Sequence, residues 1–133
     1  FIESFKFMEL KTIQALAVDD SQFMRQLIIQ YLMSFGISQT FQASNGQEAL
    51  DSLKENQEIS LVICDWSMPT LDGLTFVREV KKKKLKLFII LISSEKDPKI
   101  IQKFKSEGIE HFLIKPFTED QFNDLLEKVL SQS

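Results

Sequence analysis

The stretch Leu61-Val62-Ile63-Cys64-Asp65-Trp66-Ser67-Met68-Pro69 decides the fold. Its four leading apolar residues run directly into an aspartate, and such a run is typical of a strand buried on both faces of a parallel sheet. Asp65 therefore falls at the carboxyl end of a strand predicted at 61–64. Ligands of open α/β sheets bind at this edge, so Asp65 is the first candidate for a functional residue.

Apolar runs that alternate with segments of helical spacing also occur on both sides of this stretch. Apolar runs predict five strands, at 13–18, 38–43, 61–64, 87–92 and 110–114. Helical spacing and capping residues predict five helices, which follow Ser21, Asn45, Gly73, Asp97 and Thr118. The first helix is expected to bury an apolar stripe of Phe23, Met24, Leu27, Ile28, Tyr31, Leu32 and Phe35. Strands that alternate with helices predict an α/β fold with a parallel sheet covered on both faces.

The bulk properties indicate one cytoplasmic domain. A length of 133 residues suits a single core, and a net charge of −3 argues against a nucleic-acid partner. The apolar run at 87–92 is too short to cross a bilayer, and no secretory signal is recognisable. One cysteine and one histidine exclude a disulfide framework and a Cys/His metal site. We expect residues 1–11 to be an extension, tag or linker and residues 12–133 to form the domain.

Polar side chains follow four of the predicted strands. Asp19-Asp20, Asp65, Ser93 and Lys115 each stand where an apolar run ends. One such residue alone is usually a turn or cap residue. Because parallel strands end at one edge of their sheet, these five side chains are expected to converge on a single site.

Three carboxylates at close quarters repel one another, so the predicted site calls for a hard divalent cation such as Mg²⁺. Asp20 and Asp65 would coordinate it directly, Asp19 through a water, and a backbone carbonyl after Asp65 could add a ligand. The Asp65 carboxylate would then attack a phosphoryl group. Lys115 would stabilise charge on the phosphoryl oxygens and the Ser93 hydroxyl would donate a hydrogen bond to one of them.

These residues resemble a known family. Asp19-Asp20, Asp65-Trp66-Ser67-Met68-Pro69, Asp72-Gly73, Ser93 and Lys115-Pro116-Phe117 are similar to the motifs of response regulator receiver domains, over about residues 12 to 131. The closest likeness is to stand-alone chemotaxis regulators. The resemblance implies a flavodoxin-like sheet in the order 2-1-3-4-5. It also implies Mg²⁺-dependent phosphorylation of Asp65 by a sensor histidine kinase, in a signalling protein that is not otherwise an enzyme.

The resemblance also assigns roles to single residues. Asp19 and Asp20 would form the acidic pocket, and the Ser67 carbonyl would bind the metal. Ser93 and Phe112 would act as the switch pair, and Lys115-Pro116 would be a cis peptide. Ser67 and Glu95 occupy positions that tune the dephosphorylation rate.

The family's usual output face consists of the fourth helix, fifth strand and fifth helix. Here Ile101, Phe112 and Leu125 are expected on it, near Lys96, Lys99 and Lys103, although Ile101 could equally be core and the lysines simply solvated. A flagellar motor switch is one candidate partner, and the chain is expected to be a monomer or weak dimer. The lysine run at 81–84 is more typical of a solvated helix end than of a binding patch, and His111 is expected at the surface.

Other interpretations of the function remain open. The chain could be the receiver part of a larger response regulator or of a phosphorelay. A magnesium-dependent phosphatase with an aspartyl nucleophile is a second alternative, but that class expects Asp-x-Asp after the first strand, whereas this chain has Asp19-Asp20-Ser21. A flavodoxin-like cofactor module would need a phosphate loop where the aspartate pair stands. A nucleotide-binding P-loop is missing from the sequence.

Overall fold

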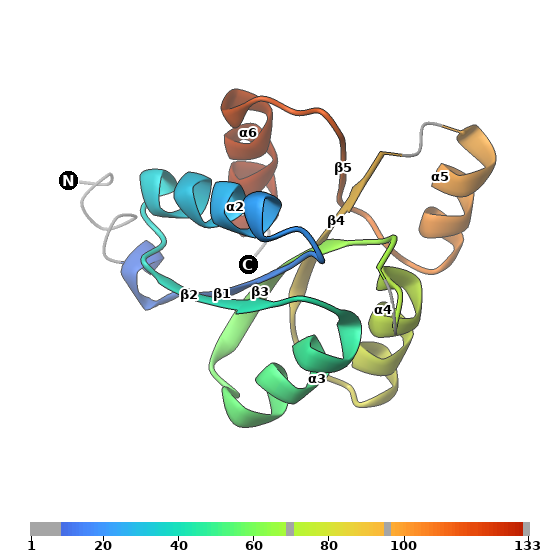
Figure 1. Cartoon of the computed structure of the whole chain (residues 1–133), viewed down its shortest axis with the longest axis horizontal. Helices are drawn as coiled ribbons and strands as arrows, with labels where there is room; N and C mark the ends of the chain where they lie inside the picture. Colours follow the sequence, from blue (N-terminus) through green and yellow to red (C-terminus); the bar gives the residue numbers. More distant parts are fainter. Residues whose placement is uncertain (1–8, 69–70, 95–96, 132–133) are drawn as a thin grey trace.

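The computed structural model describes residues 9–68, 71–94 and 97–131. A helical turn at 9–12 is followed by five strands that alternate with five helices. They are β1 (Gln14–Val18), α2 (Gln22–Phe35), β2 (Gln39–Ala43), α3 (Gly46–Glu55), β3 (Ile59–Asp65), α4 (Gly73–Lys82), β4 (Phe88–Ser93), α5 (Pro98–Ser106), β5 (Phe112–Ile114) and α6 (Glu119–Leu130). The strands form one parallel sheet in the order β2-β1-β3-β4-β5, which confirms the predicted class and order (Figure 1).

The sheet separates two layers of the core. Alternate residues of each strand point to opposite faces, so in β3 Val62 and Cys64 join one apolar cluster while Leu61 and Ile63 join the other. Helices α3, α4 and α5 cover the first face, and α2 and α6 cover the second (Figure 1). Since β3 is central and covered on both sides, its apolar run is continuous, as the sequence predicted.

Local capping sets the helix ends. Ser21 accepts a hydrogen bond from the Met24 amide at the start of α2, and Asp97 caps α5 with Pro98 in its first turn. Thr118 and Gln121 form a capping box at the start of α6. These contacts are local in sequence, which is why the starts of these helices could be predicted closely.

Some predictions about individual residues were wrong. Phe23 was expected in the buried stripe of α2, but its side chain is 74% exposed. It stands in the first turn, beside the exposed residues 20–22, whereas Ile28 and Leu32 further along the helix pack on the sheet. His111 was expected at the surface and is buried, and β5 begins only after it. Among the described residues, no helix is long and apolar enough to cross a membrane.

Candidate functional site

Asp65 is the last residue of β3 and is only 6% exposed. The next residue keeps the strand direction, because the Trp66 amide donates to the Ile92 carbonyl of β4 at 3.0 Å. The start of α4 packs closely on this segment, and a β-carbon at position 73 would lie 2.5 Å from the Trp66 Cα. Glycine at 73 therefore allows α4 to begin directly against the residue that follows Asp65.

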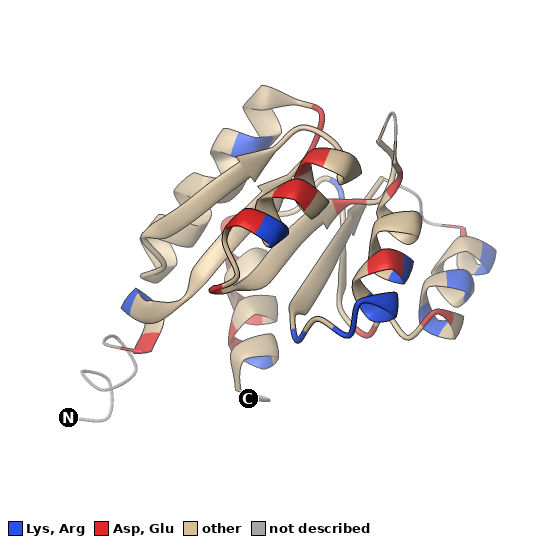
Figure 2. Ribbon diagram, turned by 90° about the horizontal axis from the view of Figure 1, so that it is seen from below, with Lys and Arg blue, Asp and Glu red and all other residues tan. Residues whose placement is uncertain are grey.

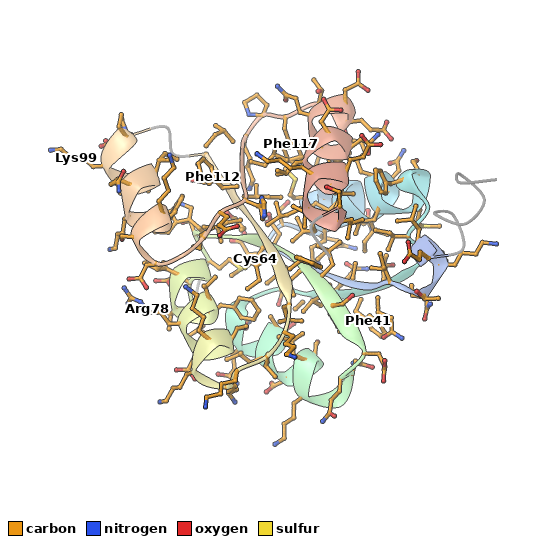
Figure 3. The ribbon with its side chains drawn as sticks, turned by 180° about the vertical axis from the view of Figure 1, so that it is seen from behind. Phe41, Cys64, Arg78, Lys99, Phe112 and Phe117 are labelled. Carbon is orange, nitrogen blue, oxygen red and sulfur yellow. The ribbon has the colours of Figure 1, made fainter. Side chains whose placement is uncertain are left out.

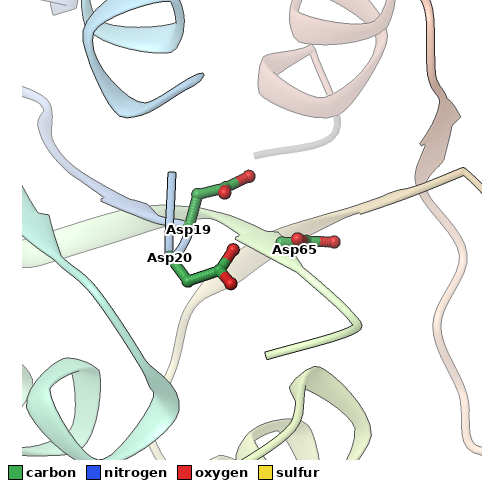
Figure 4. Close-up of side chains that lie close together, drawn as sticks. All are labelled: Asp19, Asp20 and Asp65. Carbon is green, nitrogen blue, oxygen red and sulfur yellow. The ribbon is translucent and has the colours of Figure 1, made fainter. Parts of the chain in front are cut away.

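Asp19 and Asp20 stand at the corresponding end of β1. The Asp19 amide pairs with the Ala43 carbonyl of β2, and its carboxylate accepts a hydrogen bond from the Ser21 amide at 2.9 Å. Asp19 is almost fully buried and Asp20 is exposed. Carboxylate oxygens of Asp19, Asp20 and Asp65 all lie within 4.8 Å of one another, which makes them a group able to hold a metal ion (Figure 4).

Lys115 directly follows β5 and contributes the positive charge of the site. Its Nζ lies 3.4 Å from Asp19 Oδ2 and 3.5 Å from Asp65 Oδ2, so one ammonium bridges two buried carboxylates. Its backbone amide donates to the Ser93 carbonyl at 2.8 Å, which holds the end of β5 against the end of β4. The peptide bond between Lys115 and Pro116 is cis, as predicted.

The described charged side chains that meet at this site do not balance one another. Burial raises the pKa of Asp65 above its ordinary value, and Lys115 opposes that rise without cancelling it. Burial also raises the pKa of Asp19, against the Ser21 amide hydrogen bond and the charge of Lys115. With these four described groups ionised, the carboxylates of Asp19, Asp20 and Asp65 and the ammonium of Lys115 leave two negative charges, which is the charge that a divalent cation neutralises.

The two switch candidates occupy neighbouring strands. Ser93 ends β4, is fully buried, and pairs in register with Ile114, while Ile92 pairs with Asp65. Phe112 begins β5 and lies on the side that faces α5 (Figure 3). Its ring centroid is 6.2 Å from that of Phe104, which is 5.4 Å from that of Trp66. A row of three aromatic rings therefore connects Phe112 with the residue after Asp65.

The other predicted residues are placed less completely. Ser67 is exposed and its amide donates to Asp65 Oδ1 at 3.4 Å, whereas its role as a metal ligand stays a prediction. Glu95 and Lys96 lie outside the described residues. Ile101 and Leu125 are half-buried and pack on opposite faces of the sheet, on either side of the edge strand β5.

The sequence reasoning missed two residues that shape the site. Arg25 donates from Nη1 to the Asp19 carbonyl at 2.6 Å and from Nε to Gln42 Oε1. Asp72, which the sequence identified only as part of a family motif, caps α4 by accepting from the Thr75 amide at 2.7 Å. Helical side chains lean toward the N-terminus, so a basic residue four positions after the Ser21 cap was the signal for Arg25.

Comparison with known proteins agrees with this geometry. Residues 15–127 match the model of the response regulator receiver domain, and the chain belongs to that family. The chain is 34% identical over 117 residues to a chemotaxis protein CheY homolog of Campylobacter jejuni subsp. jejuni, covering 86% of this chain and 90% of that protein. Its fold is similar to that of Vibrio cholerae chemotaxis protein CheY4, with a TM-score of 0.79, 30% identity, and 89% and 98% of the two chains covered.

Longer relatives are similar as well. The probable C4-dicarboxylate response regulator DctR of Bacillus subtilis is 30% identical over 122 residues, which cover 91% of this chain and 54% of that protein. The family and fold predicted from the sequence are thus confirmed, while the roles of individual residues and the domain bounds stay predictions.

Proposed function

We propose that this chain is the phospho-accepting receiver of a two-component system, in which Asp65 takes a phosphoryl group from a phosphohistidine of a sensor kinase. One observation carries the proposal: the Asp65 carboxylate ends the central strand within 3.5 Å of the Lys115 ammonium, beside Asp19 and Asp20. The likeness to CheY proteins supports a chemotaxis-like role, and we propose that the protein acts in the cytoplasm. The phosphatase alternative has no observation in its favour.

The chemistry is a phosphoryl transfer between protein side chains. An oxygen of Asp65 attacks phosphorus, the bond between phosphorus and the donor imidazole nitrogen breaks, and the imidazole leaves with the electron pair. Lys115, now 3.4–3.5 Å from two carboxylates, would move its ammonium to the phosphoryl oxygens. Ser93 would donate its hydroxyl hydrogen to one of those oxygens.

A Mg²⁺ ion fits the donor set. Asp20 and Asp65 would hold it directly, Asp19 through a water, and the Ser67 carbonyl would complete the protein ligands. The exposed carboxylate of Asp20 leaves access for the ion, and oxygen ligands alone suit a hard cation. When bound, the ion neutralises charge on the transferring phosphoryl group.

The proposed output is a population shift. The phosphoryl group draws Ser93 toward Asp65, and Phe112 turns into the space that Ser93 leaves. Moving such an equilibrium from mostly off to mostly on needs about 5 kcal/mol, and a hydrogen bond to a charged group contributes about 1.5–3 kcal/mol. The contacts of Ser93 and Lys115 with the phosphoryl group together approach that requirement. The changed face is α5, β5 and α6, where an output partner such as a flagellar motor switch would bind.

Intact mass spectrometry after incubation with acetyl phosphate and Mg²⁺ tests the proposal. We expect an adduct of one phosphoryl group on the wild-type chain and none on Asp65→Asn. Chelation of Mg²⁺ and the variant Asp20→Asn should each slow the reaction strongly. Full modification of Asp65→Asn, or an unmodified wild type at saturating donor, contradicts the assignment. Rates of loss of the adduct in variants at Ser67 and Glu95 test their proposed tuning role.

A further inference from the structure

Three helices of this chain end in the same way. Just past the ends of α2, α4 and α5, a backbone amide donates to a carbonyl five positions earlier, in the pairs Ile37–Leu32, Leu85–Val80 and Ile109–Phe104. The residue before each of these amides has a left-handed backbone, with φ of 119°, 57° and 82°. This is the Schellman motif, which favours glycine at the left-handed position and an apolar residue after it.

The end of α4 departs from the other two in both features. Gly36 and Gly108 fill the left-handed position after α2 and α5, but Lys84 fills it after α4, at a steric cost that glycine avoids. Ile37 and Ile109 are 0% and 5% exposed, whereas Leu85 is 41% exposed. The chain thus keeps a strained lysine and an uncovered leucine where its own two comparable helix ends have a glycine and a buried isoleucine.

Leu85 lines a groove of about 470 Å³ between the end of α3 and the connection from α4 to β4. Its apolar lining comes from Leu50, Leu53, Ile59 and Leu87. Lys54, Lys83 and Lys86 line it as well, and none of the described residues that line it is acidic or aromatic. We call this site the basic groove. Figure 2 shows the connection after α4 as a nearly continuous blue segment.

More lysines follow α4 than are needed to offset the dipole at its carboxyl end. Cations in the last turn of α4 offset its dipole, and Lys81 and Lys82 fill that role. Lys81 also donates to the Glu107 carbonyl at the end of α5, so it is already engaged. Lys83, Lys84 and Lys86 lie past the last helical residue and are exposed. Three further cations on a chain of net charge −3 mark one face for an acidic partner.

We propose that the basic groove docks an acidic segment of a partner protein, which inserts one apolar side chain against Leu85 while its carboxylates pair with Lys54, Lys83 and Lys86. The concave shape and apolar lining suit an inserted side chain, since pockets that enclose ligands measure about 300–1,000 Å³. A flat anionic membrane would leave that lining uncovered. Nucleic acid would favour aromatic stacking residues, and the lining that the structure describes contains none. A small phosphate ion would pair with the lysines but would leave the apolar lining uncovered.

Fluorescence polarisation with a synthetic probe tests the proposal. The probe is a short fluorescein-labelled peptide in which glutamates flank a single phenylalanine, and we expect a Kd of roughly 10–100 µM that weakens with added salt. The double variant Lys83→Glu/Lys86→Glu and the single variant Leu85→Ser should each weaken binding at least tenfold, about 1.4 kcal/mol. The matched control Lys105→Glu/Lys128→Glu makes the same charge change on exposed lysines of α5 and α6 and should leave the Kd within about twofold.

The remaining outcomes each overturn the proposal. They are no binding at a peptide concentration of about 1 mM, an equal Kd for a peptide with serine in place of phenylalanine, and equal losses in the test and control double variants. A second measurement is co-sedimentation of the protein with phosphatidylglycerol vesicles. If the wild type binds the vesicles, Lys83→Glu/Lys86→Glu does not, and no peptide binding is detected, the basic groove is a membrane-binding face instead. Thermal unfolding and acetyl phosphate labelling of every variant establish that fold and phosphorylation are intact, so this test is separate from that of the proposed function.

Discussion

Replacing Lys84 by glycine is expected to stabilise the fold. Lys84 has a φ of 57°, and its amide donates to the Lys81 carbonyl in the motif that ends α4. A non-glycine residue in this region costs about 1–2 kcal/mol of conformational energy. Glycine removes that cost but adds about 0.4–1 kcal/mol of chain entropy to the unfolded state. The balance is a gain of about 0.5–1 kcal/mol in the free energy of unfolding.

Urea denaturation followed by circular dichroism measures this gain. With an m-value of about 1.5–2 kcal/mol/M, the midpoint should rise by about 0.3–0.7 M. Lys83→Gly is the matched control, since it removes the same side chain one residue earlier, where φ is −83° and glycine gives no steric relief. The free energy of unfolding of Lys83→Gly should be lower than that of wild type by about 0.5–1 kcal/mol. Equal losses in the two variants would refute the reasoning, because they would show that the lysine backbone at 84 carries no strain.

Further predictions concern the site. Gly73→Ala should lower the free energy of unfolding by about 1–3 kcal/mol and slow phosphorylation, because the alanine β-carbon would collide with the Trp66 backbone. Urea midpoints measure the first effect, and the mass of the phosphoryl adduct over time measures the second. Burial raises the pKa of Asp65, so without Mg²⁺ its native state binds the proton more tightly than the unfolded chain, and ionisation at higher pH destabilises the fold. The stability of Asp65→Asn relative to wild type should therefore increase as pH rises from about 4 to 7, and a constant difference would contradict this. Trp66 is the single tryptophan, so Mg²⁺ should change its fluorescence in wild type and much less in Asp20→Asn at equal concentration.

The strand ends could be predicted because they follow from two local signals. A continuous apolar run identifies a buried strand, and parallel pairing places the carboxyl ends of all such strands at one edge. Asp65 and Lys115 are therefore brought within 3.5 Å although fifty positions separate them in the chain. Capping at Ser21 and Thr118 was equally predictable, because donor and acceptor lie three residues apart.

The features that were missed depend on contacts between distant elements. Phe23 and Phe76 are both phenylalanines in amphipathic helices, yet one is 74% exposed and the other fully buried, because only the second faces the sheet. The aromatic row through Phe104 requires α5 to sit between Trp66 and Phe112, which no periodicity in α5 predicts. The basic groove likewise exists only where the end of α3 meets the connection after α4.

The candidate site lies at the carboxyl ends of the strands, and the basic groove lies at the opposite, amino-terminal ends. Asp65 ends β3, whereas Ile59, which lines the groove, begins it. A strand of this length spans about 20 Å, more than twice the Debye length of about 8 Å at physiological salt. Direct attraction between the acidic and basic ends is therefore largely screened, and a charge change at Asp65 cannot by itself alter binding at the groove. Communication between the two would have to pass through α4, whose first residue packs on Trp66 and whose last turn leads into the groove.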